Sequence, residues 1–294
     1  MKNIKIGFIG IGLMGSPMAK NILKSRYRVK VYNRTFYKAY KLKKYGAEVC
    51  RNIKDVVSKQ DIIITMLADD KAINKIYFDD NFFKNIKKGA TVIDMSSVNP
   101  KTAIKISKKL KKHKINYLDA PVSGGTKGAE KGNLAIMVGG EKKIFLKNFE
   151  VLKKLGNPVL VGKNSAGQVA KLANQIIVGI TIGAVAEAIK LSQKRNINPL
   201  DLIKALKGGW ADSKILQTHG IRMINKDFRP KGKNISQLKD MKNILDCAKN
   251  ANLNLPLSKI VKKMYNKLVK KGLGNYDHSS LYEIYKKNLK MEIK

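Results

Sequence analysis

The sequence predicts an α/β protein in which a doubly wound sheet is followed by an all-α C-terminal domain, with one long helix joining the two. Three observations support this. Short apolar runs alternate with helical patterns over roughly the first 160 residues, a glycine-rich turn follows the first run, and the last 100 residues are helical in pattern. We therefore expect three parts: residues 1–164, the joining helix 165–194, and residues 195–294.

Size and composition fit one large or two ordinary domains. The chain has 294 residues, of which 44% are hydrophobic, so it can bury a core and is not a disordered chain. Two cysteines exclude a disulfide scaffold, and three histidines leave little for a histidine-rich metal site. We expect reduced thiols, no metal and a cytoplasmic location.

The net charge of +39 comes almost entirely from lysine, which supplies 53 of the 60 basic residues. Nucleic-acid readers depend on arginine for bidentate contacts, and here the lysines spread along the whole chain. We interpret the charge as a compositional bias that attracts anionic substrates and cofactors, with no nucleic-acid partner.

No membrane partner is expected either. The most apolar helical run covers 11 residues, 176–186, whereas a bilayer requires about 20. Residues 1–19 superficially resemble a signal peptide, but four glycines interrupt their apolar stretch. Cleavage there would also remove the first predicted strand.

The first predicted unit is strand, glycine-rich turn, helix, strand. An apolar run at 5–9 leads into a GxGxxG motif, a helical pattern follows at 18–24, and 27–32 alternates as a second strand. This is the context of a Rossmann-type dinucleotide-binding turn, in which the first glycine allows the turn, the second admits the pyrophosphate and the third lets helix and strand pack. The residues expected at the cofactor are Gly10, Ile11, Gly12, Leu13, Met14 and Gly15.

The end of the second strand indicates which dinucleotide binds. NAD enzymes usually place an acidic residue there to hold the ribose 2′-hydroxyl, but this chain has Asn33, Arg34 and Thr35. Arg34 can pair with a 2′-phosphate and stack on adenine. We expect NADP (NADPH) rather than NAD, although an ordinary surface arginine at this position leaves NAD possible.

Further short strands are expected at 61–67, 91–95, 117–122, 134–138 and 158–161. Ligands of doubly wound sheets bind at the carboxyl ends of the strands. Met66 and Leu67 with Ala68, and Ser96 with Ser97, are therefore candidate cofactor contacts, or else simple strand caps.

Two later segments carry candidate chemistry. Ser123, Gly124 and Gly125 form a turn that can cradle a small carboxylate, although a purely structural turn is the alternative. In the helix from Ser165 to about Lys194, the residues that share a face or its shoulder are Gly167, Lys171, Asn174 and Gln175. Lys171 is flanked by small and apolar residues, and a partly desolvated lysine with a lowered pKa suits acid–base work near neutral pH.

The last 100 residues are broken near Pro199, Gly208, Pro230, Pro256 and Gly272. Such a helical domain commonly packs against another subunit, so we expect a homodimer or homotetramer. Trp210 belongs to a candidate pocket segment, where it either lines the site or packs between helices.

Four motifs in this order resemble the β-hydroxyacid dehydrogenases, the group of 3-hydroxyisobutyrate dehydrogenase, tartronate semialdehyde reductase and the glyoxylate and succinic semialdehyde reductases. The motifs are GFIGIGLMG at 7–15 with Met18 and Asn21, DAPVSGG at 119–125, GQVAKLANQ at 167–175, and Lys239-Asp240-Met241. The resemblance covers the whole chain.

The resemblance implies a role for each matching residue. Ser123 with the amides of Gly124 and Gly125 would bind the substrate carboxylate, and Lys171 would be the general acid in reduction. Asn174 would place the substrate, and Lys239 would reach the cofactor. Gln175, also expected at the substrate, departs from members that have two successive asparagines. Val178 stands where the related 6-phosphogluconate dehydrogenases have a glutamate, which disfavours decarboxylation.

The expected activity is therefore NADPH-dependent reduction of a small semialdehyde or 2-oxo acid, of the glyoxylate, succinic semialdehyde or tartronate semialdehyde type. NAD-dependent oxidation of 3-hydroxyisobutyrate is the alternative. A nucleic-acid-binding protein on the same fold is a distant one, because relatives of that kind lose the lysine that this chain keeps as Lys171.

Overall fold

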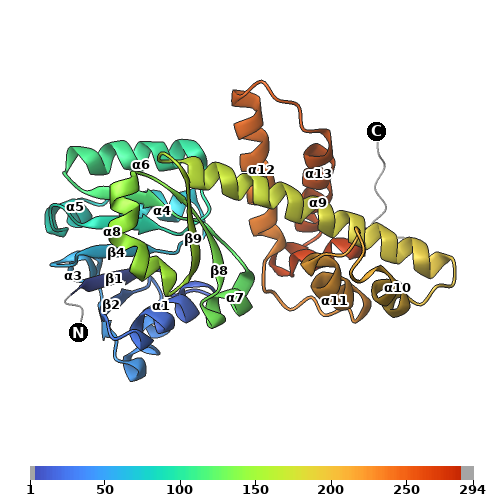
Figure 1. Cartoon of the computed structure of the whole chain (residues 1–294), viewed down its shortest axis with the longest axis horizontal. Helices are drawn as coiled ribbons and strands as arrows, with labels where there is room; N and C mark the ends of the chain where they lie inside the picture. The colour runs from blue at the N-terminus through green and yellow to red at the C-terminus, as the bar shows by residue number, and fades with distance from the viewer. Residues whose placement is uncertain (1–3, 286–294) are drawn as a thin grey trace. The chain divides into compact units, whose positions relative to one another are not determined.

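The computed structural model describes residues 4–285, which fall into two compact units (Figure 1). The first unit is Met1–Lys171 and the second is Leu172–Lys294. The division lies within the long helix, between Lys171 and Leu172, so the first residues of that helix belong to the unit that contains the sheet.

The first unit contains a nine-stranded mixed sheet of order β3-β2-β1-β4-β5-β6-β8-β7, with β9 paired to β8. The strands are β1 (Lys5–Ile9), β2 (Arg28–Tyr32), β3 (Glu48–Val49), β4 (Ile62–Thr65), β5 (Thr91–Asp94), β6 (Asn116–Asp119), β7 (Val122–Ser123), β8 (Leu134–Gly139) and β9 (Gly156–Gly162). The first six strands are parallel to one another. The doubly wound architecture predicted from the alternating pattern is confirmed.

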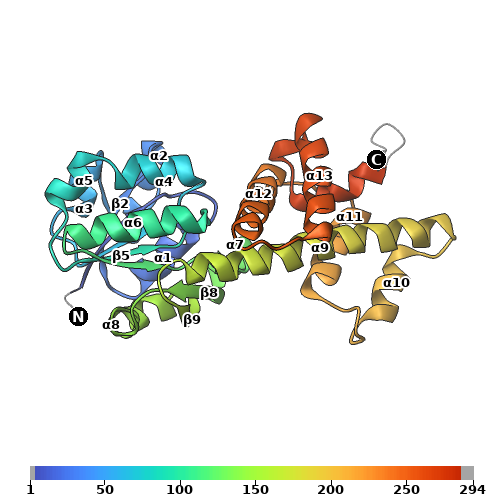
Figure 2. The ribbon, with the colours of Figure 1, turned by 90° about the horizontal axis from the view of Figure 1, so that it is seen from above.

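Helices cover both faces of the sheet (Figure 2). Because side chains alternate along a strand, Ile62 and Ile64 of β4 pack with α1 and α8, whereas Ile63 packs with α4 and α6. The helices of this unit are α1 (Gly15–Lys24), α2 (Phe36–Tyr40), α3 (Ile53–Val57), α4 (Asp70–Tyr77), α5 (Asp80–Asn85), α6 (Pro100–Lys112), α7 (Gly125–Lys131) and α8 (Lys142–Lys153), with a 3₁₀ turn at Lys43–Tyr45.

The strand expected at 117–122 is divided in two. β6 ends at Asp119, and Pro121, which has no backbone N–H to donate, separates it from β7. Ser123 pairs with Ala135 in an antiparallel ladder, and Asp119 pairs with Gly139 of β8 in the same sense. This edge of the sheet is therefore mixed, which the apolar pattern alone did not show.

Between Leu172 and residue 285 the second unit is helical, as predicted. Its elements are the greater part of α9 (Ala166–Lys194), α10 (Pro199–Leu206), a π-helical turn (Leu216–Gly220), α11 (Ile221–Ile224), α12 (Asn234–Asn250), α13 (Pro256–Lys270) and two 3₁₀ segments (Leu273–Asn275 and His278–Tyr285). Ile182, Ala186 and Ile189 of α9 pack with Tyr265 and Leu281 in its core.

The apolar part of α9 is longer than the 11 residues counted in the sequence. By length and composition this 29-residue helix could cross a membrane, a test that core helices of soluble proteins also pass. Of its most apolar 18-residue window, 44% is buried inside the structure. The 11-residue run seen in the sequence therefore understates the apolar length of α9.

Candidate active site

The turn between β1 and α1 requires glycine at two positions. Gly10 has φ +101°, and a Cβ there would lie 2.3 Å from the carbonyl oxygen of Met66. A Cβ on Gly15 would lie 1.9 Å from the carbonyl oxygen of Gly10. Around Gly12, by contrast, no atom comes within 4 Å of a built Cβ, so this side of the turn is open to a ligand. The turn's own packing thus requires glycine at Gly10 and Gly15, and Gly12 lies on the open side, where the pyrophosphate is predicted to approach.

The start of α1 suits an anion. Met14 at its N-cap makes no side-chain cap, and the first turn holds no acidic residue. At α4, by contrast, the Asp69 carboxylate caps the helix and Asp70 follows in the first turn. The positive end of α1 is therefore open to phosphate, and Gly12, Leu13 and Met14 are the residues that would hold the pyrophosphate of a dinucleotide.

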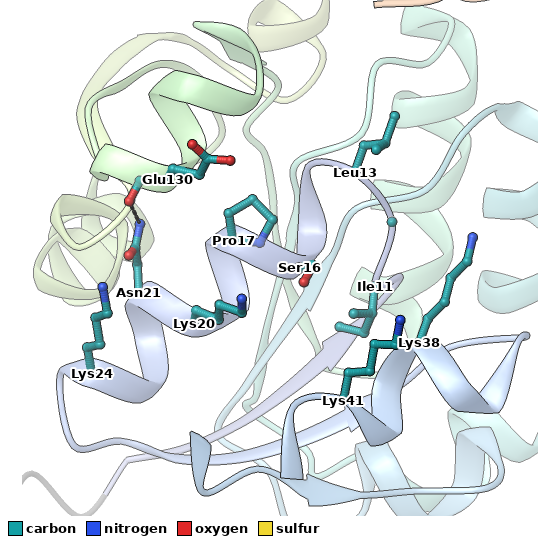
Figure 3. A pocket seen from close by; sticks show the side chains of 11 residues that line it. Ile11, Leu13, Ser16, Pro17, Lys20, Asn21, Lys24, Lys38, Lys41 and Glu130 are labelled. Carbon is teal, nitrogen blue, oxygen red and sulfur yellow. Dashed lines mark hydrogen bonds between the residues drawn. The ribbon is translucent and has the colours of Figure 1, made fainter. Parts of the chain in front are cut away.

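A pocket of about 530 Å³ lies beside this turn (Figure 3). Its walls come from the turn, α1, α2 and α7. The lining residues are Ile11, Gly12, Leu13, Ser16, Pro17, Lys20, Asn21, Lys24, Lys38, Lys41 and Glu130. Four ammonium groups thus stand against one carboxylate, which suits a phosphate-bearing ligand. Lys38 and Lys41 were not predicted from the sequence, although Lys38 follows Arg34 by only four residues.

Of the three residues after β2, Asn33 bonds to the backbone, whereas Arg34 and Thr35 face solvent. Asn33 accepts a hydrogen bond at Oδ1 from the Ile11 N–H (2.9 Å) and donates from Nδ2 to the Thr35 carbonyl (2.9 Å). Asn33 therefore fixes the glycine-rich turn to the end of β2. Arg34 and Thr35 are exposed and available to a ligand.

The ends of β4 and β5 are held together by Ser96. Its hydroxyl accepts from the Leu67 N–H (2.8 Å), and its own N–H donates to Asp94 Oδ1 (3.0 Å). Burial raises the pKa of Asp94 to about 6. Ser96 is thus structural, whereas Met66 and Ser97 are half-buried at the same edge and remain candidate cofactor contacts.

The turn that follows β7 has the conformation expected of a cradle. Gly124 and Gly125 both have positive φ, +136° and +64°, and no atom comes within 4 Å of a built Cβ on Gly125. Ser123 immediately precedes them at the end of β7. The open side of this turn suits a small carboxylate.

Lys171 lies in α9 at the end of the first unit, where its side chain is only 8% exposed. Asn174 and Gln175 follow in the second unit. Asn174 Nδ2 donates to Gln175 Oε1 (2.8 Å), and Gln175 Nε2 donates to Asp240 Oδ2 (2.7 Å) and Gln237 Oε1 (3.0 Å). The Gln175 amide therefore bridges α9 and α12.

Lys239 belongs to the same network, because its Nζ lies 3.2 Å from Asp240 Oδ1. The structure thus links Asn174, Gln175 and Lys239, which were predicted separately as site residues. Asp240 was noted in the sequence only as part of a motif, and Gln237 was missed, since its role depends on how α12 packs against α9. Trp210 is 107% exposed, so of the two alternatives left open for it, packing between the helices of its own unit is not what the structure shows.

Two family models together match almost the whole chain. Residues 5–170 match the NAD binding domain of 6-phosphogluconate dehydrogenase, and residues 165–285 match the NAD-binding region of NADP-dependent 3-hydroxyisobutyrate dehydrogenase.

Full-length relatives agree with these matches. The chain is 38% identical to 2-hydroxy-3-oxopropionate reductase of Escherichia coli, over 95% of this chain and 96% of the relative. It is 32% identical to 2-(hydroxymethyl)glutarate dehydrogenase of Eubacterium barkeri, over 97% and 95%. The solved structure of Mycobacterium tuberculosis 3-hydroxyisobutyrate dehydrogenase with L-serine superimposes with a TM-score of 0.87 at 25% identity, covering 96% of this chain and 99% of that one.

Proposed function

The chain belongs to the β-hydroxyacid dehydrogenase family and is an NAD(P)-dependent oxidoreductase; within that family, we propose that it uses NADPH to reduce a small semialdehyde or 2-oxo acid to the hydroxyacid. Glyoxylate, succinic semialdehyde and tartronate semialdehyde represent the substrate class. The observation that carries the choice of cofactor is the exposed Arg34 after β2, with no acidic residue beside it and with Lys38 in the adjoining pocket.

The choice of direction and substrate draws support from the relatives. The Escherichia coli relative, 38% identical, is named as a reductase of 2-hydroxy-3-oxopropionate, which is tartronate semialdehyde. Such a substrate carries a carboxylate and an aldehyde. The Ser123 turn would hold the carboxylate, with Gly124 and Gly125 offering backbone N–H groups.

When bound, the nicotinamide supplies the hydride that reduces the carbonyl carbon. In our proposal Lys171 donates the proton to the carbonyl oxygen, and its ammonium stabilises the charge that develops there. The family resemblance assigns Asn174 to orienting the substrate without adding charge, and Lys239 to the cofactor. In the opposite direction Lys171 would accept the proton from the alcohol.

The test is a spectrophotometric assay of NADPH and then NADH oxidation. The panel is glyoxylate, succinic semialdehyde, tartronate semialdehyde and methylmalonate semialdehyde. We expect turnover of one of the first three with a higher kcat/KM for NADPH than for NADH.

Three results would contradict the proposal. NADH-linked activity restricted to methylmalonate semialdehyde, or oxidation of 3-hydroxyisobutyrate with NAD, would favour the activity named for the Mycobacterium tuberculosis structure. Silence with both cofactors in folded protein would refute the reductase assignment, and salt-labile binding to duplex DNA would then support a binding role.

A further inference from the structure

Gln168, in the first turn of α9, commits both polar atoms of its side chain to a single loop. Its Oε1 accepts a hydrogen bond from the Val98 N–H (3.0 Å), and its Nε2 donates to the Ser96 carbonyl (2.9 Å). The side chain is fully buried, and so is Ser96. Gln168 therefore holds the loop after β5, which contains the candidate cofactor contact Ser97.

The same turn of α9 is held from the other side by Asp119, at the end of β6. Asp119 accepts hydrogen bonds from the Ser165 N–H at Oδ1 (2.7 Å) and from the Gln168 N–H at Oδ2 (3.0 Å). Burial raises the pKa of Asp119 to about 6, so it is a carboxylate at neutral pH and suits the positive end of a helix. A Cβ on Gly167 would lie 2.6 Å from the Asp119 carbonyl oxygen, which shows how closely the two segments approach.

This long-range cap differs from those elsewhere in residues 4–285. Five helices are capped by the side chain of their own N-cap residue: Asn52, Asp69, Asp79, Asn99 and Asn198. The helix that carries Lys171 instead takes its cap from a carboxylate 46 residues from Ser165. A local cap would serve the stability of α9 equally well. A remote one also fixes where α9 starts relative to β6.

Three segments are thereby tied together within the first unit: the loop after β5, the start of the Asp119–Gly125 segment, and the first turn of α9. The first two segments carry Ser97, a candidate cofactor contact, and Ser123, which is assigned to the substrate carboxylate, and the third leads into the next turn of α9, which carries Lys171. Lys171 follows Gln168 by three residues, about one helical turn, so the position of Gln168 along α9 determines that of Lys171.

We propose that Gln168 and Asp119 are positioning residues for hydride and proton transfer, which set the Lys171 ammonium in register with the cofactor loop and the substrate turn. The inference rests on the proposed function of Lys171. Neither residue has to touch the substrate, and their effect is on geometry, to which transfer reactions are sensitive at the scale of about 1 Å.

The test substitutes Gln168→Met, which keeps the length of the side chain and removes both hydrogen bonds. We expect kcat to fall roughly 10- to 100-fold, while the KM of the aldehyde and the Kd of NADPH change by less than about threefold. The kinetic isotope effect with deuterium at the transferred position of NADPH should rise, because a misaligned transfer step becomes rate-limiting.

The matched control is Asn148→Leu. Asn148 is also a buried amide in the first unit, and its Nδ2 donates to Thr91 Oγ1 (3.3 Å) and the Ile144 carbonyl (2.8 Å). Thr91 is the first residue of β5, whereas Ser96 follows the other end of that strand. The variant therefore loses comparable buried hydrogen bonds at a distance from the site. It should lower the melting temperature without changing kcat or the isotope effect. Equal kinetic behaviour of the two variants below their melting temperatures would refute the positioning role.

A second readout separates this inference from the proposed function. Hydrogen exchange of the amides at 96–98 and 165–171 should accelerate together in Gln168→Met and stay slow in Asn148→Leu, whether or not the protein turns over an aldehyde. Unchanged exchange in both segments of Gln168→Met would show that Gln168 does not hold them together, even if the enzyme is active. If Gln168→Met does not fold, Gln168→Glu replaces it, since it keeps the acceptor for Val98 and loses only the donor to Ser96.

Discussion

Lys171 differs from the other lysines of this chain in its surroundings. Among residues 4–285 it is the one lysine whose side chain is buried, although 53 lysines make the residue type itself uninformative. Its small and apolar neighbours in the sequence signalled that burial. The structural roles of Asn33 and Gln175 could not be predicted in this way. Their side-chain amides bond to Ile11 and Asp240, which lie far from them in the sequence.

Replacing Lys171 removes the proton donor of the proposed reaction. Lys171→Ala should lower kcat by at least about 100-fold with NADPH binding retained, since loss of a general acid typically costs 10²–10⁴. Steady-state kinetics and NADPH fluorescence titration measure the two effects. Lys194→Ala, at the exposed end of the same helix, is the control and should retain full activity. Normal turnover in Lys171→Ala would exclude this lysine from the mechanism.

Arg34 is the residue on which the preference for NADPH depends. Arg34→Ala should raise the KM of NADPH by roughly 10- to 100-fold and leave that of NADH nearly unchanged, because the charge-assisted pair with a 2′-phosphate is lost. Arg28→Ala, at the opposite end of β2, is the control. An equal change in the KM of NADPH and NADH would show that Arg34 does not bind the 2′-phosphate.

At the scale of elements, the second unit brings together two histidines that the sequence separates by 59 positions. His219, in the π-helical turn, and His278 place their Nε2 atoms 2.8 Å apart, with Asp277 alongside. The Asp277 carboxylate already pairs with Arg222 (2.7 Å) and accepts from the backbone of Lys231 and Gly232. This cluster joins the π-helical turn to the C-terminal 3₁₀ segment, and nothing in the sequence pattern indicated it.

The histidine pair predicts acid sensitivity of the second unit. Burial, with the neighbouring charge of His278, lowers the pKa of His219 to about 4 from 6.5. Between these values the unfolded chain binds a proton that the folded chain does not, so His219 makes stability fall as the pH drops from about 6.5 to about 4. The full effect is at most roughly 3 kcal/mol.

Urea unfolding of the wild type and His219→Gln at neutral pH and in mild acid measures this contribution. The free energy of unfolding should decline less steeply with acid in His219→Gln. His113→Gln, which changes the exposed third histidine, should decline like the wild type. Identical slopes for all three proteins would mean that His219 titrates normally.

At the scale of the whole molecule, the second unit leaves large apolar side chains uncovered. Ile177, Leu191 and Trp210 are 66%, 67% and 107% exposed, all on α9 or after α10. This supports our proposal that the protein is a homodimer or homotetramer. The charge of +39 is dispersed along the chain and comes mostly from lysine, so we propose that the protein has no nucleic-acid partner. We also propose that it is cytoplasmic and that its substrates are small anions.

Light scattering after size-exclusion chromatography tests the assembly. We expect two or four times the chain mass of 32.8 kDa, and a shift toward the single-chain mass in Leu191→Lys combined with Trp210→Ser. Leu146→Lys changes a leucine of the first unit that is 58% exposed, and it should leave the mass unchanged. A wild-type protein of single-chain mass would contradict the proposal.

The sequence by itself determined the sheet-forming half, the glycine-rich turn, the helical half and the segment that carries Lys171. These features are set by local rules: strand and helix periodicity, and glycines that a tight turn demands at Gly10 and Gly15. Only the tertiary structure decided how distant groups pair. The Asp119 cap of α9, the link from Gln175 to Asp240 and the histidine pair each depend on backbones brought together by packing. Sequence periodicity carries no information about such pairings, because it reports which face of an element is buried and not what that face meets.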